Sequence, residues 1–224
     1  MFRGDGSSLR AQAGNGHTPG QVSPSQPWPA GYPAGESTRN SRGLEQFLLT
    51  LKDLPTCSVL DLGGANQNNI NYITNLGHRI SSENVLHGLD AIWNNPEPTE
   101  SSKIAGLIEQ TFDYHESTFG GVLVWDTLQF LPPPVLAAVI ERISYLMSPG
   151  GQLLAFLNSD EKAQTIPAYS YRIVDTKTML LAPRTLRRRE QFFNNRAIER
   201  VFQSYGAVKF FLTRDHLREV LVKR

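Results

Sequence analysis

A glycine turn that follows a short aliphatic run is the part of this sequence best suited to bind a ligand. Residues 58–69 read SVLDLGGANQNN, a run that ends in one acid and then in small residues, namely Asp61, Gly63, Gly64 and Ala65. A strand buried on both faces is usually a continuous aliphatic run, and small residues after it let the backbone approach a ligand and turn sharply into a helix. The pattern predicts a cofactor-binding turn at the carboxyl end of a strand.

A second acid, Glu83, lies about 20 residues beyond this turn, where nucleotide sites often place a carboxylate. It belongs to a plausible strand over residues 79–85. A carboxylate at this distance accepts hydrogen bonds from ribose hydroxyls, and the neutral Asn84 is a weaker candidate for the same role. The alternative interpretation is a solvated glutamate at the end of a strand.

A third candidate pair, Trp125 and Asp126, closes the apolar run of residues 121–126. Open α/β sheets bind ligands at the carboxyl ends of their strands, so this pair is expected to face the same ligand as the glycine turn. The alternatives are that Trp125 packs in the core and that Asp126 caps a turn or a helix.

The elements that position these residues alternate between strand and helix. Apolar residues recur at helical spacing in four segments, residues 44–51, 70–76, 104–108 and 135–146. Near the end of the chain, two β-rich runs are separated by only Asp215 and His216, a link so short that it requires an antiparallel hairpin. The sequence therefore predicts an α/β fold, a doubly wound and mostly parallel sheet with helices on both faces and a C-terminal antiparallel hairpin.

Three blocks of the sequence together resemble a known family. In chain order they read VLDLGG, FGGVLVWDTLQFLPPP and LMSPGGQLLAFL. In this order the blocks are similar to the class I S-adenosylmethionine-dependent methyltransferases of small-molecule type, over about residues 45–224. The resemblance implies a Rossmann-like fold, S-adenosylmethionine as cofactor, and transfer of its methyl group to an acceptor that the sequence does not identify.

The resemblance also implies which residues surround the cofactor. They are Asp61, Gly63, Gly64, Ala65, Glu83, Glu109, Trp125 and Asp126. The turn and its acid would hold the amino-acid part and the ribose, and Glu83 would bind the ribose hydroxyls. Glu109 would face the adenine amine, and the last pair would line the methionine end and the substrate entrance.

Catalytic residues are not assigned, because a sulfonium already carries an excellent leaving group and rate can come from positioning alone. Asp126 or His115 would act as the general base that accepts a proton from a nitrogen or oxygen nucleophile. Gln67 stands where the family has a small residue, and its side chain would crowd the cofactor. The alternative is therefore a catalytically silent methyltransferase fold that serves as a binding or scaffolding protein.

An arginine-rich segment leaves a further alternative open. Its arginines are interleaved with phenylalanines and are Arg184, Arg187, Arg188, Arg189, Arg196 and Arg200. Such a cluster can bind an RNA backbone, which would make the protein an RNA-directed methyltransferase. The competing interpretation is an amphipathic helix in which Ile198, Val201 and Phe202 are buried and the arginines form the solvated face.

Composition sets limits on the remaining classes of function. The chain has 224 residues, 40% hydrophobic residues and a net charge of +1, which suits one globular domain and gives no overall attraction to nucleic acid or membrane. The single cysteine excludes an internal disulfide and fits a reducing compartment, and the five histidines show no metal-ligand spacing. We expect a cytoplasmic protein with no structural metal and no membrane span.

The N-terminal residues differ in composition from the rest of the chain. Residues 1–40 are rich in Gly, Ser, Pro, Asn and Gln, a composition that cannot bury enough apolar surface to fold. We expect a disordered tail over 1–40 and a methyltransferase-like domain over 41–224. Trp28 and Tyr32 lie among prolines and are either a partner-docking motif or part of a plain linker.

Overall fold

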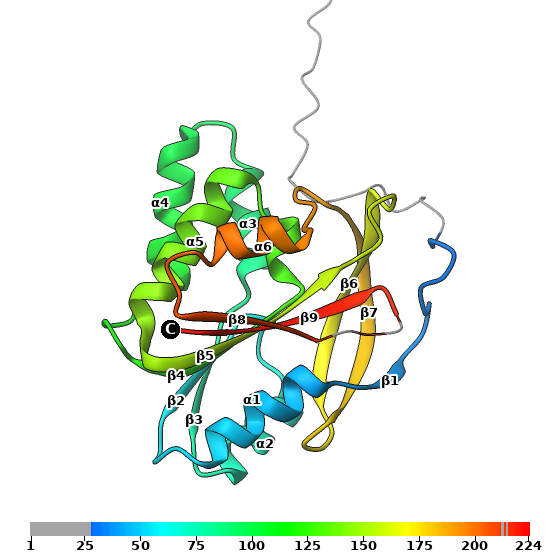
Figure 1. Ribbon diagram of the computed structural model, residues 1–224. Helices are drawn as coiled ribbons and strands as arrows, with labels where there is room; N and C mark the ends of the chain where they lie inside the picture. Colours follow the sequence, from blue (N-terminus) through cyan, green and yellow to red (C-terminus); the bar gives the residue numbers. More distant parts are fainter. Residues whose placement is uncertain (1–27, 212, 214) are drawn as a thin grey trace, which may run out of the picture.

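The computed structural model describes residues 28–211, 213 and 215–224, which form two β-sheets and the helices that cover them (Figure 1). The larger sheet has the strand order β3-β2-β4-β5-β9-β8. Its strands are β2 (Ser58–Asp61), β3 (Arg79–Ser82), β4 (Phe119–Trp125), β5 (Met147–Asn158), β8 (Ala207–Phe211) and β9 (Leu217–Lys223). Among these six strands, β9 alone runs in the direction opposite to the other five.

Helices cover both faces of the larger sheet, which confirms the predicted doubly wound α/β fold (Figure 1). One face carries α1 (Arg42–Lys52) and α2 (Gln67–Asn75); the other carries α3 (Val85–Trp93), α4 (Glu100–Thr111), α5 (Pro133–Leu146) and α6 (Asn195–Val201). Every residue of β4 is buried, as its unbroken apolar sequence predicts. Val122 and Val124 pack in one core and Leu123 in the other.

The helices begin where their sequences supply a cap. Asn66 and Asn84 accept hydrogen bonds from backbone N–H groups in the first turns of α2 and α3, and α5 begins at Pro133, whose missing N–H has no partner to lose there. A short 3-10 helix, η1 (Thr127–Phe130), joins β4 to α5. Helices α2, α3 and α5 therefore begin close to the carboxyl ends of β2, β3 and β4.

The smaller sheet was not predicted. It has the order β1-β7-β6, all antiparallel, with β1 (Ser37–Asn40), β6 (Thr165–Ile173) and β7 (Thr178–Arg188). Figure 1 shows it beside the end of the larger sheet, with β6 and β7 crossing near β9. The predicted domain boundary at residue 41 is therefore too late, because Ser37–Asn40 pairs with β7. Residues 1–27, the greater part of the predicted tail, lie outside the described residues.

Two further segments differ from expectation. Helix α4 runs over Glu100–Thr111, longer at both ends than the predicted 104–108, and in this fully described segment the chain passes from α3 through α4 to β4 without an intervening strand. The arginine-rich segment is not one amphipathic helix. Its first half is the end of β7, because those residues pair with β6, and only Asn195–Val201 is helical.

Candidate functional site

Asp61 lies at the carboxyl end of β2 and is fully buried. Its Oδ1 accepts hydrogen bonds from the Gly63 N–H at 2.9 Å and the Trp125 Nε1–H at 2.6 Å. Its Oδ2 accepts one from the Asn69 side-chain amide at 2.9 Å. Burial raises the pKa of Asp61, while these three bonds oppose the rise. Both carboxylate oxygens are therefore engaged inside the protein.

The Trp125 indole fills the space directly over the glycine turn. A Cβ atom built on Gly63 would lie 2.7 Å from Trp125 Cδ1. The indole is parallel to the Tyr171 ring, with 5.0 Å between centroids and 2° between planes, and Trp125 is 1% exposed. Its φ of 55° places the backbone in the left-handed region, which bulky residues rarely adopt. The strained backbone of Trp125 therefore coincides with the contact between its indole and the glycine turn.

Side chains at the carboxyl end of β4 and at the start of α2 also bind β6, which is an edge strand of the smaller sheet. Asn69 donates from its amide to the Tyr171 carbonyl at 3.0 Å and accepts from the Ile173 N–H at 2.8 Å. Asp126 accepts from the Tyr169 N–H at 3.1 Å. Backbone groups on the edge of a buried strand need partners, and here side chains supply them. We call this set of contacts the sheet joint: Asp61, Asn69, Trp125 and Asp126 on the larger sheet, with Tyr169, Tyr171 and Ile173 on β6.

The other predicted cofactor residues lie around or away from the turn. The Gly64 N–H donates to the Glu83 carbonyl at 2.9 Å, and the half-buried Glu83 carboxylate accepts from the Tyr114 hydroxyl at 2.6 Å. Ala65 is exposed, and Glu109 is exposed on α4, so the structure does not bring Glu109 to the glycine turn.

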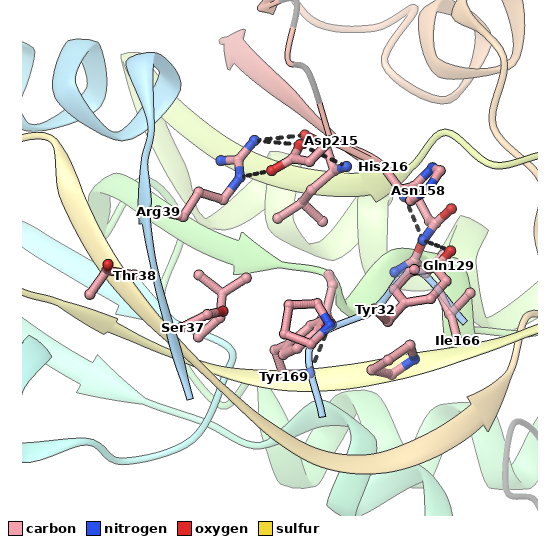
Figure 2. Close-up of a pocket in the computed structure, with 16 residues that line it drawn as sticks. Tyr32, Ser37, Thr38, Arg39, Gln129, Asn158, Ile166, Tyr169, Asp215 and His216 are labelled. Atoms are coloured by element: carbon pink, nitrogen blue, oxygen red, sulfur yellow. Dashed lines mark hydrogen bonds and ion pairs between the residues drawn. The ribbon is translucent and has the colours of Figure 1, made fainter. Parts of the chain in front are cut away.

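Two neighbouring cavities lie on either side of Asp126 and Tyr169, which line both. The inner cavity, about 170 Å³, lies beside the glycine turn and is bounded by Gly63, Asn84 and Trp125. The outer cavity, about 280 Å³, lies between the N-terminal segment, β6 and the start of β9 (Figure 2). The inner cavity is well below the roughly 300 Å³ at which pockets for small organic ligands begin.

The directions of the strands match what the sequence resemblance implies, because the last strand of the chain, β9, is antiparallel in an otherwise parallel sheet. In the strand order this strand holds the penultimate position. The arrangement is the Rossmann-like fold that the resemblance to the class I S-adenosylmethionine-dependent methyltransferases implies. The sequence matches no protein-family model, and no curated protein is significantly similar to it.

Solved structures with a similar chain path include several methyltransferases. The 1,6-didemethyltoxoflavin-N1-methyltransferase of Burkholderia thailandensis is 15% identical over 82% of this chain and 77% of its own, with a TM-score of 0.46. A SAM-dependent methyltransferase of Archaeoglobus fulgidus is 9% identical over 81% and 91%, with a TM-score of 0.49. The glycopeptide N-methyltransferase MtfA is 14% identical over 82% and 95%, with a TM-score of 0.43.

The residues at the glycine turn do not fit S-adenosylmethionine as they stand. A cofactor that lies over such a turn needs free space above the first glycine, and the protein's own indole fills that space. The N–H groups of Gly63 and Gly64 are bound to Asp61 and to the Glu83 carbonyl. Gln67, expected to crowd the cofactor, instead lies exposed on α2 and bonds to Asn71. The obstruction comes from Trp125.

Asp126 is the second buried carboxyl of the sheet joint whose pKa is raised. It is 3% exposed, and burial raises its pKa to about 7, although the Tyr169 N–H and the charge of Arg184 lower it. Such a carboxyl can take up or release a proton near neutral pH.

The arginine-rich segment does not form one basic surface. Arg187 is buried and makes two hydrogen bonds to Asp90, at 2.6 and 2.8 Å. Arg189 is also buried and donates to the carbonyls of Asn158 and Asp160. Both side chains hold segments of the fold together, so a continuous basic path for RNA through residues 187–189 lacks support.

The described residues contain neither a cluster suited to a metal ion nor a helix suited to a bilayer. No three His, Cys, Asp or Glu side chains in this part of the chain come close enough to hold a metal ion. None of its helices is both long and apolar enough to cross a bilayer.

Sequence reasoning missed the residues that complete the joint. Asn69 is four residues before the buried Ile73 on α2, so it occupies an apolar-face position, and a polar residue there signals a buried hydrogen-bonding role. Tyr169 and Tyr171 are two residues apart on β6 and point the same way along the strand, but nothing local places them against β4.

Proposed function

We propose that this chain is a catalytically silent methyltransferase fold, a binding protein that does not use S-adenosylmethionine. The observation that carries the proposal is the position of Trp125, stacked on Tyr171, hydrogen-bonded to Asp61 and packed on Gly63. Asp61, the acid that would hold a cofactor, instead accepts a hydrogen bond from Asn69, which in turn binds β6 in the sheet joint.

The energetic consequence can be worked out from Trp125. Removing a buried tryptophan from its site costs about 3–5 kcal/mol. A cofactor that displaced the indole would lose this amount from its binding free energy, and about 1.4 kcal/mol corresponds to a factor of ten. A micromolar site would therefore be weakened by a factor of about 10² to 10⁴, to a dissociation constant between about 0.1 and 10 mM.

Calorimetric titration with S-adenosylmethionine and S-adenosylhomocysteine tests the proposal. We expect neither ligand to bind the unmodified chain at micromolar concentration. Micromolar binding, about 8 kcal/mol, that Asp61→Ala abolishes would refute the proposal. Trp125→Ala opens the turn, and any weak binding that it restores locates the obstruction. Trp93→Ala is its matched control, because Trp93 is a partly buried tryptophan on α3, away from the turn.

A methyltransferase that acts on a small molecule is the second candidate, and the meeting of two cavities at Asp126 favours it. In that function the outer cavity would hold the acceptor, and Asp126, with its pKa near 7, would take the proton from the acceptor. Bound S-adenosylmethionine would supply the electrophilic methyl group. Micromolar cofactor binding in the titration above decides for this candidate and against the first.

A further inference from the structure

The outer cavity is enclosed by segments far apart in the sequence. Tyr32 from the N-terminal segment, Tyr169 and Ile166 from β6, and His216 before β9 form its walls (Figure 2). The rings of Tyr32 and His216 are 5.4 Å apart between centroids. At about 280 Å³ the cavity approaches the lower limit for small organic ligands, so it suits a compact one. Aromatic and aliphatic walls of this kind favour a flat ligand.

Gln129, on η1, directs an unused hydrogen-bond donor into this cavity. Its Oε1 accepts from the Asn158 backbone N–H at 2.9 Å, which fixes the orientation of the amide and makes the other atom the Nε2 donor. Gln129 is 2% exposed and lines the cavity. Asn158 is the described side-chain partner of this amide and occupies only its Oε1, so the Nε2 donor is left to the cavity that Gln129 lines. A donor that faces a cavity favours a ligand that brings an acceptor.

Tyr32 supplies a second donor to the same cavity. Its hydroxyl accepts from the Asn158 side-chain amide at 2.8 Å. The Asn158 Oδ1 accepts from the Asp160 N–H at 2.8 Å, so the orientation of this amide is fixed as well. The hydroxyl proton of Tyr32 is therefore directed to another acceptor, and Tyr32 and Gln129 both bond to Asn158 (Figure 2).

The charges around the cavity select against an anion. Arg39 is the arginine in its lining, and its Nε donates to Asp215 at 2.6 Å while its Nη1 pairs with the buried Glu219. Two carboxylates therefore balance its charge. Asp126 adds a further acidic group to the lining. An anionic ligand would be repelled by Asp126, and the arginine of the described lining is already paired with two carboxylates.

We propose that the outer cavity binds a neutral, flat aromatic lactam. Its carbonyl accepts hydrogen bonds from Gln129 Nε2 and from the Tyr32 hydroxyl, its N–H donates to Asp126, and its rings lie among Tyr32, Tyr169 and His216. This inference rests on the proposed function, because it names the class of ligand that the proposed binding protein would bind.

Titration of the full chain with 2-quinolone, a neutral bicyclic lactam, tests the inference. We expect saturable binding of 2-quinolone, at least tenfold weaker binding of quinoline, which lacks the carbonyl and the N–H, and no binding of quinoline-2-carboxylate. Equal affinity for quinoline and 2-quinolone, tighter binding of the carboxylate, or no binding of 2-quinolone would each overturn the inference. Binding of S-adenosylmethionine in its own titration bears on the proposed function alone, so the two failures are distinguishable.

Two variants identify the donors. Gln129→Glu keeps an oxygen for the Asn158 N–H and removes the donor, and we expect at least a tenfold loss of 2-quinolone affinity. Gln203→Glu, at an exposed site, is its control and leaves affinity unchanged. Tyr32→Phe removes only a hydroxyl, so it tests the proposal even if the first variant does not fold. We expect a severalfold loss of 2-quinolone affinity. Tyr145→Phe, at an exposed site, is its control and should lose none. Unchanged affinity in both cavity variants refutes the assignment.

Discussion

Replacing Asp126 by asparagine should change how stability depends on pH. The carboxyl is buried, and burial raises its pKa from 3.8 to about 7 in the folded state. Between these values the folded protein holds a proton that the unfolded chain releases, so the free energy of unfolding falls as pH rises from about 4 to about 7. At about 1.36 kcal/mol for each pH unit, the full loss is about 4 kcal/mol. Asparagine keeps an oxygen for the Tyr169 N–H and does not titrate.

Urea unfolding of both proteins at about pH 5 and about pH 8 measures this effect, and about 3 kcal/mol of the loss falls within that interval. The unmodified chain should lose about 3 kcal/mol more stability over the interval than Asp126→Asn does. Asp61, whose pKa is also raised by burial, contributes a loss in the same direction to both proteins. Asp113→Asn, at an exposed site, is the control and should behave as the unmodified chain. Equal pH dependence in Asp126→Asn and the unmodified chain would refute the reasoning.

Three other substitutions probe the same part of the molecule, each measured by urea unfolding. Asn69→Ala removes three hydrogen bonds and leaves buried groups unsatisfied, so we expect a loss of about 3 kcal/mol or more, against little change for the exposed Asn71→Ala. Arg187→Lys replaces a buried bidentate pair by a single point charge and should cost about 2 kcal/mol, whereas the exposed neighbour Arg188→Lys should not. Trp125→Phe keeps a ring to stack but loses its N–H bond, and we expect a loss of about 1–3 kcal/mol. Losses in the control variants as large as in their partners would contradict the assignments.

The larger sheet could be predicted because its signals are local. The apolar run that becomes β4, the glycine turn after β2 and the prolines before α5 each specify an element from its own residues. The short link between β8 and β9 specifies an antiparallel pair in the same way. The order of the strands in the sheet was not predicted and comes from the structure.

The smaller sheet could not be predicted because its pairing is not local. Strand β1 reads STRN, a polar sequence without strand character, and its partner β7 begins at Thr178. The pairing of β6 with β7 likewise includes Pro167, a residue that argues against a strand in isolation. Tertiary contact, not propensity, makes these strands.

Four of the predicted site residues lie together in the structure, but the sequence does not reveal their partners on β6. Asp61, Gly63, Trp125 and Asp126 do lie together at one edge of the sheet, as the carboxyl ends of parallel strands require. Their partners Tyr169 and Tyr171 come from a segment more than 40 residues beyond β4. The sequence therefore does not reveal that Asp126 and Trp125 contact β6.

Hydrogen exchange at two amides tests the central claim most directly, because the sheet joint holds the N–H groups of Tyr169 and Ile173 with the side chains of Asp126 and Asn69. We predict that both amides are protected to the degree of the buried strand β4, and that millimolar S-adenosylhomocysteine leaves their rates unchanged. Fast exchange at these two amides, or a change in their rates on addition of S-adenosylhomocysteine, would contradict the proposal that the residues of the sheet joint hold the two sheets together and do not bind the cofactor.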